Sequence, residues 1–170
     1  MKEIDFRADL LPYKDKLFRL ALRITQDYAE AEDVVQDTLV RAWERRGELE
    51  KVNSVEAYLL TVCRNLSIDR SEKRENRNLS LSQADIDAPA TDASPHERLE
   101  QDERLQYVRE LLQRLPERQR AAIQLRDIEG MSYRDAAQAL GMTEDVLRVT
   151  LHRARQTLRG ALEKEYNYGL

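Results

Sequence analysis

The sequence contains little of what several classes of protein need. Cys63 is the single cysteine, which excludes an intramolecular disulfide, and the two histidines are far apart, which leaves zinc without a ligand set. There is no apolar run long enough to cross a membrane and no signal peptide, so we expect a cytoplasmic protein without membrane insertion. A nucleophile, a metal set and a phosphate-binding loop are all missing. We therefore expect no enzyme activity, no catalytic residues, no metal and no cofactor.

Glycine and aromatic residues are also scarce. Five glycines in 170 residues, together with abundant Ala, Leu, Glu, Gln and Arg, predict an all-α fold. This length allows one or two small domains with cores that need neither a disulfide nor a metal. The net charge of −4 excludes a protein that coats nucleic acid indiscriminately, so any contact with DNA has to come from local patches.

Hydrophobic periodicity divides the chain into two parts. Three amphipathic helices that can close a bundle are predicted in the first part, at residues 6–25, 28–46 and 54–77, with a loop at 47–53. Residues 78–93 are rich in Ser, Ala and Asp and predict a flexible acidic linker. A capping box at Ser94 starts the next helix. The predicted organisation is therefore two helical domains, residues 1–77 and 94–170, joined by that linker.

A helix-turn-helix pattern occupies residues 132–159 of the second domain. Ser132 caps a short helix, Gly141 ends it, and Thr143 caps a longer helix. The longer helix is expected to bury a stripe of small and aliphatic residues, Leu147, Leu151, Ala154, Leu158 and Leu162. The first helix of the domain is expected to bury Leu99, Leu105, Val108, Leu111, Leu112 and Leu115. This arrangement is typical of motifs that place their second helix in a major groove.

The longer helix is basic and has no acid between residues 146 and 160. Such a face can neutralise phosphates and pair with guanine edges. We expect DNA contacts from Arg148, Val149, His152, Arg153 and Arg155. The alternative is an ordinary helical hairpin with a solvated basic face, which capping, turn and charge together disfavour.

Two further charged patches lie in the first domain. Asp33, Gln36 and Asp37 meet on one helix face through their i, i+3 and i+4 spacing. They form either a solvated surface or a docking site for a basic protein, since an acid–base or metal role lacks a cleft and a histidine partner. The end of the third helix is either a frayed charged terminus or a surface for unstacked bases. Its residues are Arg64, Asn65, Asp69, Arg70 and Arg74.

With these features in place, the chain resembles the extracytoplasmic-function sigma factors of bacterial RNA polymerase, the two-domain branch of the sigma-70 class. Four blocks carry the resemblance in the family's order and spacing: AEAEDVVQDTLVRAWERR (29–46), AYLLTVCRNLSIDR (57–70), LPERQRAAIQLRDIEGMSY (115–133) and LHRARQTLR (151–159). The match extends from about Asp9 to Leu162. This ordered set is far more specific than a helix-turn-helix alone.

The resemblance implies an alternative sigma factor, which binds core RNA polymerase and directs promoter recognition and melting for transcription initiation. It implies that Asp33, Gln36 and Asp37 dock on the clamp helices of the largest subunit, and that the flap of the second largest subunit is a further partner. Residues Arg64 to Arg74 would melt and read the minus-ten element, and the helix-turn-helix would read the minus-thirty-five element. An anti-sigma factor is a candidate partner. The alternative reading is a helix-turn-helix regulator that binds operator DNA without stable polymerase association.

The recognition helix departs from many relatives at its start. Glu144 and Asp145 stand where those relatives have small residues. Because acids repel phosphates, we expect weaker or differently registered contacts with the minus-thirty-five element.

Overall fold

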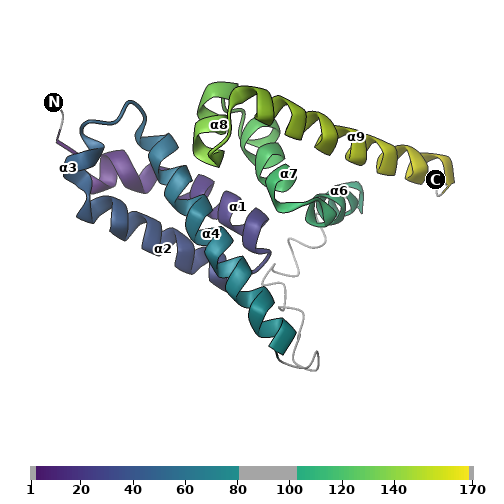
Figure 1. Cartoon of the computed structure of the whole chain (residues 1–170), viewed down its shortest axis with the longest axis horizontal. Coiled ribbons are helices and arrows are strands. Elements are labelled where there is room, and N and C mark those ends of the chain that lie inside the picture. The colour runs from purple at the N-terminus through teal and green to yellow at the C-terminus, as the bar shows by residue number, and fades with distance from the viewer. Residues whose placement is uncertain (1–2, 81–102, 169–170) are drawn as a thin grey trace.

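The computed structural model describes residues 3–80 and 103–168, and this part of the chain is helical, without a strand. The helices form two bodies that lie against each other (Figure 1). The fold is therefore all-α with two helical domains, as predicted. The capping box at Ser94 and most of the predicted linker lie outside the described residues, while α4 continues as far as Ser80.

The first domain begins with three short segments rather than the single helix predicted over 6–25. A π-helical turn, η1 (Phe6–Leu10), and a 3-10 turn, η2 (Leu11–Tyr13), precede α1 (Lys14–Thr25). Pro12 lies within the 3-10 turn and has no N–H to donate, so an α-helical ladder cannot run through it. The prediction of one continuous helix was wrong for this reason.

The predicted three-helix bundle is formed by α1, α2 (Tyr28–Glu44) and α4 (Val55–Ser80). A short helix, α3 (Arg46–Leu49), occupies part of the predicted loop, because Leu49 enters the core and is 1% exposed. Ser54 caps α4 as expected, by accepting a hydrogen bond from the N–H of Ala57 at 3.1 Å. The bundle core is aliphatic and includes Leu17, Leu20, Ile24, Val34, Val35, Leu39, Leu59, Leu60 and Leu66.

Five helical segments form the described part of the second domain: α6 (Glu103–Arg114), α7 (Glu117–Ala122), η4 (Ile123–Ile128), α8 (Tyr133–Leu140) and α9 (Glu144–Tyr168). The predicted caps of the helix-turn-helix are confirmed. The N–H of Asp135 donates to the Ser132 hydroxyl at 3.1 Å, and the N–H of Val146 donates to Thr143 Oγ1 at 3.1 Å. Gly141 takes a φ of 65° between α8 and α9, the left-handed conformation that the turn requires.

Two residues predicted to be buried are not. Leu105 on α6 is 56% exposed, and Leu162 on α9 is 42% exposed. Val108 of α6 and Leu158 of α9, which pack against the core, are themselves only partly buried. Because α9 continues past the rest of the domain (Figure 1), its helical stripe extends farther than the core that covers it.

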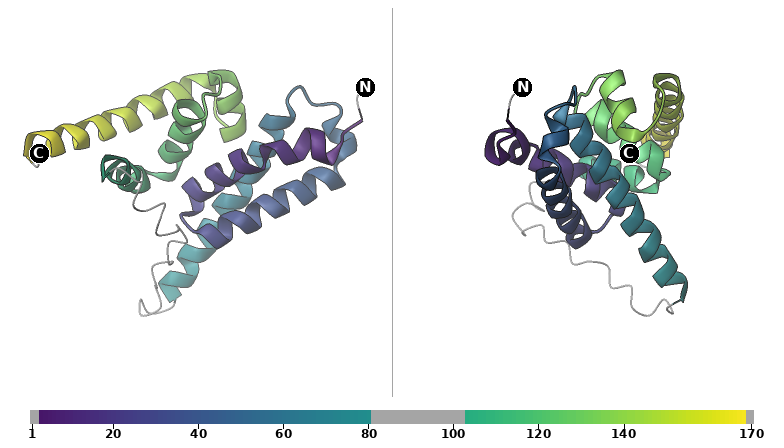
Figure 2. Two further views of the ribbon diagram at one scale, coloured as in Figure 1. Left: turned by 180° about the vertical axis from the view of Figure 1, so that it is seen from behind. Right: turned by 60° about the vertical axis from the view of Figure 1, so that its left-hand side comes forward.

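The two domains share an extensive interface, which the sequence did not predict. Helix α4 packs against α8, and α1 packs against α7 and η4. Figure 2 shows the two domains from two further directions. Most of the buried apolar residues of the two domains form one continuous cluster.

Candidate nucleic-acid and polymerase interfaces

The recognition helix α9 is anchored on one side and open on the other. Leu147, Leu151 and Ala154 are fully buried against the rest of the domain. The residues predicted to contact DNA, Arg148, Val149, His152, Arg153 and Arg155, are all exposed. The structure therefore presents this face to a partner without any rearrangement of the helix core.

An aromatic ring organises the arginines at the start of this face. The guanidinium carbon of Arg126 lies 4.3 Å from the ring centroid of Tyr133, and that of Arg148 lies 5.2 Å from it. Arg148 also reaches the two acids of the first turn, at 3.2 Å from Asp145 and 3.6 Å from Glu144. The acids that we expected to repel phosphates thus lie against an arginine of the same helix.

Arg155 connects α9 to η4. Its Nε and Nη2 donate to the carboxylate of Asp127 at 3.0 Å and 2.5 Å. The hydrogen bonds to Asp127 raise the pKa of Arg155, and hydrogen bonding from Arg155 and then Arg126 lowers the pKa of Tyr133. Arg155 therefore fixes α9 on η4, and its guanidinium is less available to a partner than the side chain of Arg153, which is exposed.

The acidic face of α2 is paired with α4. The guanidinium of Arg70 bonds to Asp33, to Asp37 at 2.6 Å and to Glu30 at 3.2 Å. The hydrogen bond to Asp33, supported by the neighbouring carboxylates, raises the pKa of Arg70. Arg70 was predicted to contact DNA, whereas Asp33 and Asp37 were predicted to contact polymerase. The structure therefore joins the two predicted sets through this arginine.

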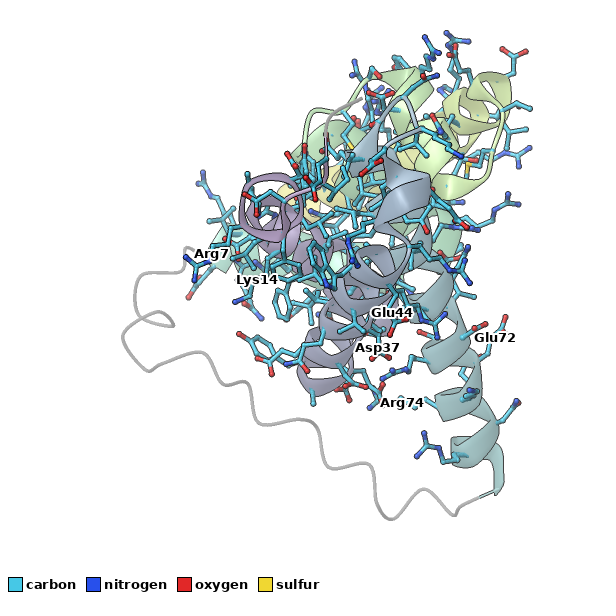
Figure 3. The ribbon with its side chains drawn as sticks, turned by 90° about the vertical axis from the view of Figure 1, so that its left-hand side faces the viewer. Arg7, Lys14, Asp37, Glu44, Glu72 and Arg74 are labelled. Atoms are coloured by element: carbon cyan, nitrogen blue, oxygen red, sulfur yellow. The ribbon has the colours of Figure 1, made fainter. Side chains whose placement is uncertain are left out.

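Of the other residues predicted to read the minus-ten element, some are exposed and one pairs with a residue next to α2. Arg64 donates to the side-chain oxygen of Asn65 at 3.1 Å, and Asn65 and Asp69 are exposed. Arg74 turns toward α2 and pairs with Asp27 at 2.9 Å. Figure 3 shows Asp37 and Arg74 along the seam between these helices, with Glu72 on the outer side of α4.

Other kinds of site find no support in the described residues. Within residues 3–80 and 103–168, no group of His, Cys, Asp or Glu is placed to hold a metal ion. None of the helices in these ranges is long and apolar enough to cross a bilayer.

Comparison with known proteins shows the family to which the chain belongs. The models for sigma-70 region 2 and sigma-70 region 4 match residues 11–77 and 105–158. SigL, an ECF RNA polymerase sigma factor of Mycobacterium tuberculosis, is 35% identical over 149 residues, which cover 87% of this chain and 83% of SigL. The chain belongs to the extracytoplasmic-function sigma factors.

Other members of this sigma factor family are longer. The ECF RNA polymerase sigma factor SigE of Mycolicibacterium smegmatis is 34% identical over 89% of this chain, which spans 59% of SigE. This chain spans 38% of the probable RNA polymerase sigma factor RfaY of Xanthomonas campestris. Among solved structures, the sigma factor RpoE in complex with the anti-sigma factor NepR from Bartonella quintana aligns with a TM-score of 0.77 and 30% identity. That alignment covers 94% of this sigma factor and 97% of RpoE.

Several residues at these surfaces were not predicted as site residues from the sequence. Tyr133, Arg126 and Asp127 organise the start of the recognition face, and Glu30 joins the acids around Arg70. A signal for three of them was available, because an Arg-Asp pair precedes Gly130 and a tyrosine follows the cap residue Ser132. Nothing in the spacing of Glu30 and Arg70 shows that they meet.

Proposed function

We propose that this chain acts as an alternative sigma factor, which binds core RNA polymerase and directs promoter recognition and melting for transcription initiation. The observation that carries the proposal is the order of the two matched sigma-70 regions, each on its own helical domain. In this proposal residues 1–77 bind polymerase and the minus-ten element, 78–93 connect the domains, and 94–170 bind the minus-thirty-five element. The protein is then a transcription initiation factor, with no reaction of its own, that works in the cytoplasm.

The polymerase-binding surface is proposed to be the outer face of α2. Asp33, Gln36 and Asp37 share that face, and both acids remain partly accessible, with side chains 56% and 42% exposed. A carboxylate surface suits a basic partner such as the clamp helices of the largest subunit. The second domain is proposed to meet the flap of the second largest subunit.

Reading of the minus-ten element is proposed for the α4 face that carries Arg64, Asn65, Asp69, Arg70 and Arg74. Asn65 is exposed and has an amide that can hydrogen-bond the edge of an extruded base. Arg64 and Asp69 lie beside it. Arg70 and Arg74 face the acids of α2 in the free chain, so they support the DNA only after exchanging those partners.

Reading of the minus-thirty-five element is proposed for α9. Arg148, Val149, His152 and Arg153 form a solvent-facing surface on a capped helix, which is the geometry that fits a major groove. Arg155 supports this helix through Asp127.

An anti-sigma factor is the proposed regulator. RpoE, the solved sigma factor that aligns over nearly the whole chain, is in complex with an anti-sigma factor. The similarity supports a regulator of the same kind for this chain.

Reconstitution with core polymerase tests the proposed function. The purified protein is mixed with core polymerase, and transcription starts on its own genomic DNA are mapped against core polymerase alone. We expect a new set of starts preceded by shared minus-ten and minus-thirty-five sequences. Tight dimeric binding to operator DNA, without any change in polymerase starts, would instead identify an operator-binding regulator.

A further inference from the structure

The first arginine of the recognition helix contacts residues of two helices. Long helical side chains lean toward the N-terminus of their helix, which brings Arg148 over the first turn of α9. Its Nη1 lies 3.2 Å from Oδ1 of Asp145, and its Nη2 lies 3.6 Å from Oε2 of Glu144. Its guanidinium carbon also lies 5.2 Å from the ring centroid of Tyr133, which belongs to α8. Tyr133, Glu144 and Asp145 are called the arginine cradle below.

The tyrosine of the arginine cradle is itself held in place. The guanidinium carbon of Arg126 lies 4.3 Å from the ring centroid of Tyr133, and Nη1 of Arg126 donates to the carbonyl of Met131 at 2.6 Å. Arg155, which bonds to Asp127 of η4, is a further hydrogen-bond partner of Tyr133. The ring therefore gives the first arginine of α9 a fixed surface to pack on.

The acids of the arginine cradle change the charge at the start of α9. A helix N-terminus attracts phosphate through its free N–H groups and its dipole, and an arginine attracts phosphate through its positive charge. Glu144 and Asp145 lie in the first turn of α9, where their two carboxylates outweigh the single charge of Arg148. Their side chains are 46% and 96% exposed, so they repel a phosphate group that approaches this end of the helix.

A guanine edge makes different demands from a phosphate. Its O6 and N7 atoms accept hydrogen bonds but carry no net charge. A guanidinium has five N–H donors, so the hydrogen bond from Arg148 to Asp145 leaves donors for a base. Ordering a free arginine side chain lowers affinity by about two- to tenfold, and an arginine that is already held in place avoids part of that loss.

We propose that the arginine cradle makes Arg148 a base-specific contact, because it positions the guanidinium for a guanine edge and keeps phosphate away. Tyr133, Glu144 and Asp145 then determine the sequence specificity of the start of α9 without touching the base themselves. This inference rests on the proposed role of α9 in reading duplex DNA. It also gives the two acids a second effect, since they lower the affinity for DNA of any sequence and raise the preference for one sequence.

Selection from a pool of random-sequence duplexes tests this preference in the whole 170-residue chain. The selecting proteins are the parent, Arg148→Ala, and Glu144→Gln combined with Asp145→Asn, which is called the amide variant. Fluorescence anisotropy then gives dissociation constants for the selected duplex and for a scrambled one. We expect the parent to select a guanine at one position that Arg148→Ala no longer distinguishes. The amide variant should lose preference at the same position, and its ratio of scrambled to selected dissociation constants should fall about tenfold.

Salt dependence shows whether phosphate now reaches the start of α9. The amide variant should bind the scrambled duplex about tenfold more tightly than the parent does, and its affinity should fall more steeply with salt. The matched control is Glu163→Gln combined with Glu165→Gln, which makes the same change in net charge on the exposed distal part of α9. This control should leave the preference for the selected guanine unchanged.

Tyr133 is tested by removing its aromatic face. Tyr133→Leu should lower the ratio of dissociation constants about fivefold, whereas Tyr133→Phe keeps the ring and should retain most of the ratio. A purely structural role of Tyr133 predicts instead that both duplexes lose affinity equally. Circular dichroism of each variant checks that the chain is folded.

Several results would overturn the proposal. They are a base preference that does not depend on Arg148, an unchanged ratio in the amide variant, or a further loss when the amide changes are added to Arg148→Ala, because positioning requires the arginine. If the parent selects no sequence, the reading of duplex DNA by α9 and this proposal both fail. If it selects a sequence but does not change the starts made by core polymerase, the proposed sigma function fails and the arginine cradle stands.

Discussion

The two surfaces proposed for partners differ in how the chain uses their charges. On the seam between α2 and α4, Arg70 already bonds to three carboxylates of α2. On α9, His152 and Arg153 project into solvent from a helix whose other side is packed. The first surface can bind a basic partner only by sharing or exchanging an ion pair. On the second surface His152 and Arg153 are exposed, while Arg148 lies against two acids of its own helix.

This difference shows that a charged side chain on the surface is not automatically free for a partner. Partly exposed ion pairs contribute only about 0.2–1 kcal/mol each, so a partner can replace them at modest cost. The exchange of ion pairs still restricts which partner can bind. The partner has to place a cation beside the α2 carboxylates in the position that Arg70 leaves.

The strongest test of the α2 surface reverses two of its charges. Asp33→Lys combined with Asp37→Lys should weaken binding to core polymerase about 100-fold or more, because like charges then face the basic partner and Arg70. The binding constant can be measured by titrating labelled protein with core polymerase. Glu163→Lys with Glu165→Lys, on the exposed distal part of α9, makes the same change in net charge. An equal loss in that control would show a general charge effect rather than a docking surface.

The recognition helix is tested by removing its first arginine. Arg148→Ala should weaken binding to a duplex that carries the minus-thirty-five element about tenfold, through loss of a base contact. Binding to core polymerase should not change. Arg159→Ala, farther along the exposed face, should lower affinity for all duplexes alike. If Arg148→Ala weakens polymerase and promoter binding equally, the assignment of Arg148 to base reading is rejected.

The role of Arg70 inside the chain predicts a loss of stability. Arg70→Ala leaves three carboxylates facing one another, and the free energy of unfolding should fall by about 1–2 kcal/mol. Urea denaturation followed by circular dichroism measures this change. Lys73→Ala, at an exposed position of the same helix, should stay within about 0.5 kcal/mol of the parent protein. Equal stability of the two variants would mean that the α2–α4 ion pairs contribute nothing.

The smallest effect is expected at Cys63, which lies on α4 and contacts α1. Burial raises the pKa of its thiol to about 12, and the thiol donates to the carbonyl of Leu17 at 3.3 Å. The folded protein should therefore resist alkylation at pH 8, with labelling only as fast as the first domain unfolds. Because the thiol ionises more readily when unfolded, stability should decline as the pH rises above about 9. Rapid labelling of the folded protein would contradict the burial of this residue.

Much of the fold could be predicted because local signals and burial agree. Ser54, Ser132 and Thr143 cap their helices as expected, and Gly141 takes the left-handed turn. The errors occurred where periodicity was extended through a proline or where a helix extends beyond the core that it packs on. Pro12 breaks the first helix, and Leu105 and Leu162 continue a helical stripe beyond the residues that could cover it. Hydrophobic periodicity shows which face of a helix is apolar. It does not show how far a neighbouring helix extends to cover that face.

The candidate site was predicted as a list of residues but not as a set of contacts. The outward positions on α9 and α2 follow from helical spacing, and the structure places them on the surface. The pairing of Arg70 with α2 and of Arg155 with Asp127 depends on how helices pack, which spacing within one helix does not contain. The interface between the domains could not be predicted for the same reason, because Arg19 and Glu129 meet there but are 110 positions apart in the sequence.

The continuity of α9 has a mechanical consequence. This helix runs without interruption from Glu144 to Tyr168, and 25 residues make a rod about 37 Å long. A protein that bound the distal third of this helix would also act on the end proposed to contact DNA, because a continuous helix transmits a rotation along its length. Under this proposal, promoter reading can be regulated from a surface that never touches DNA.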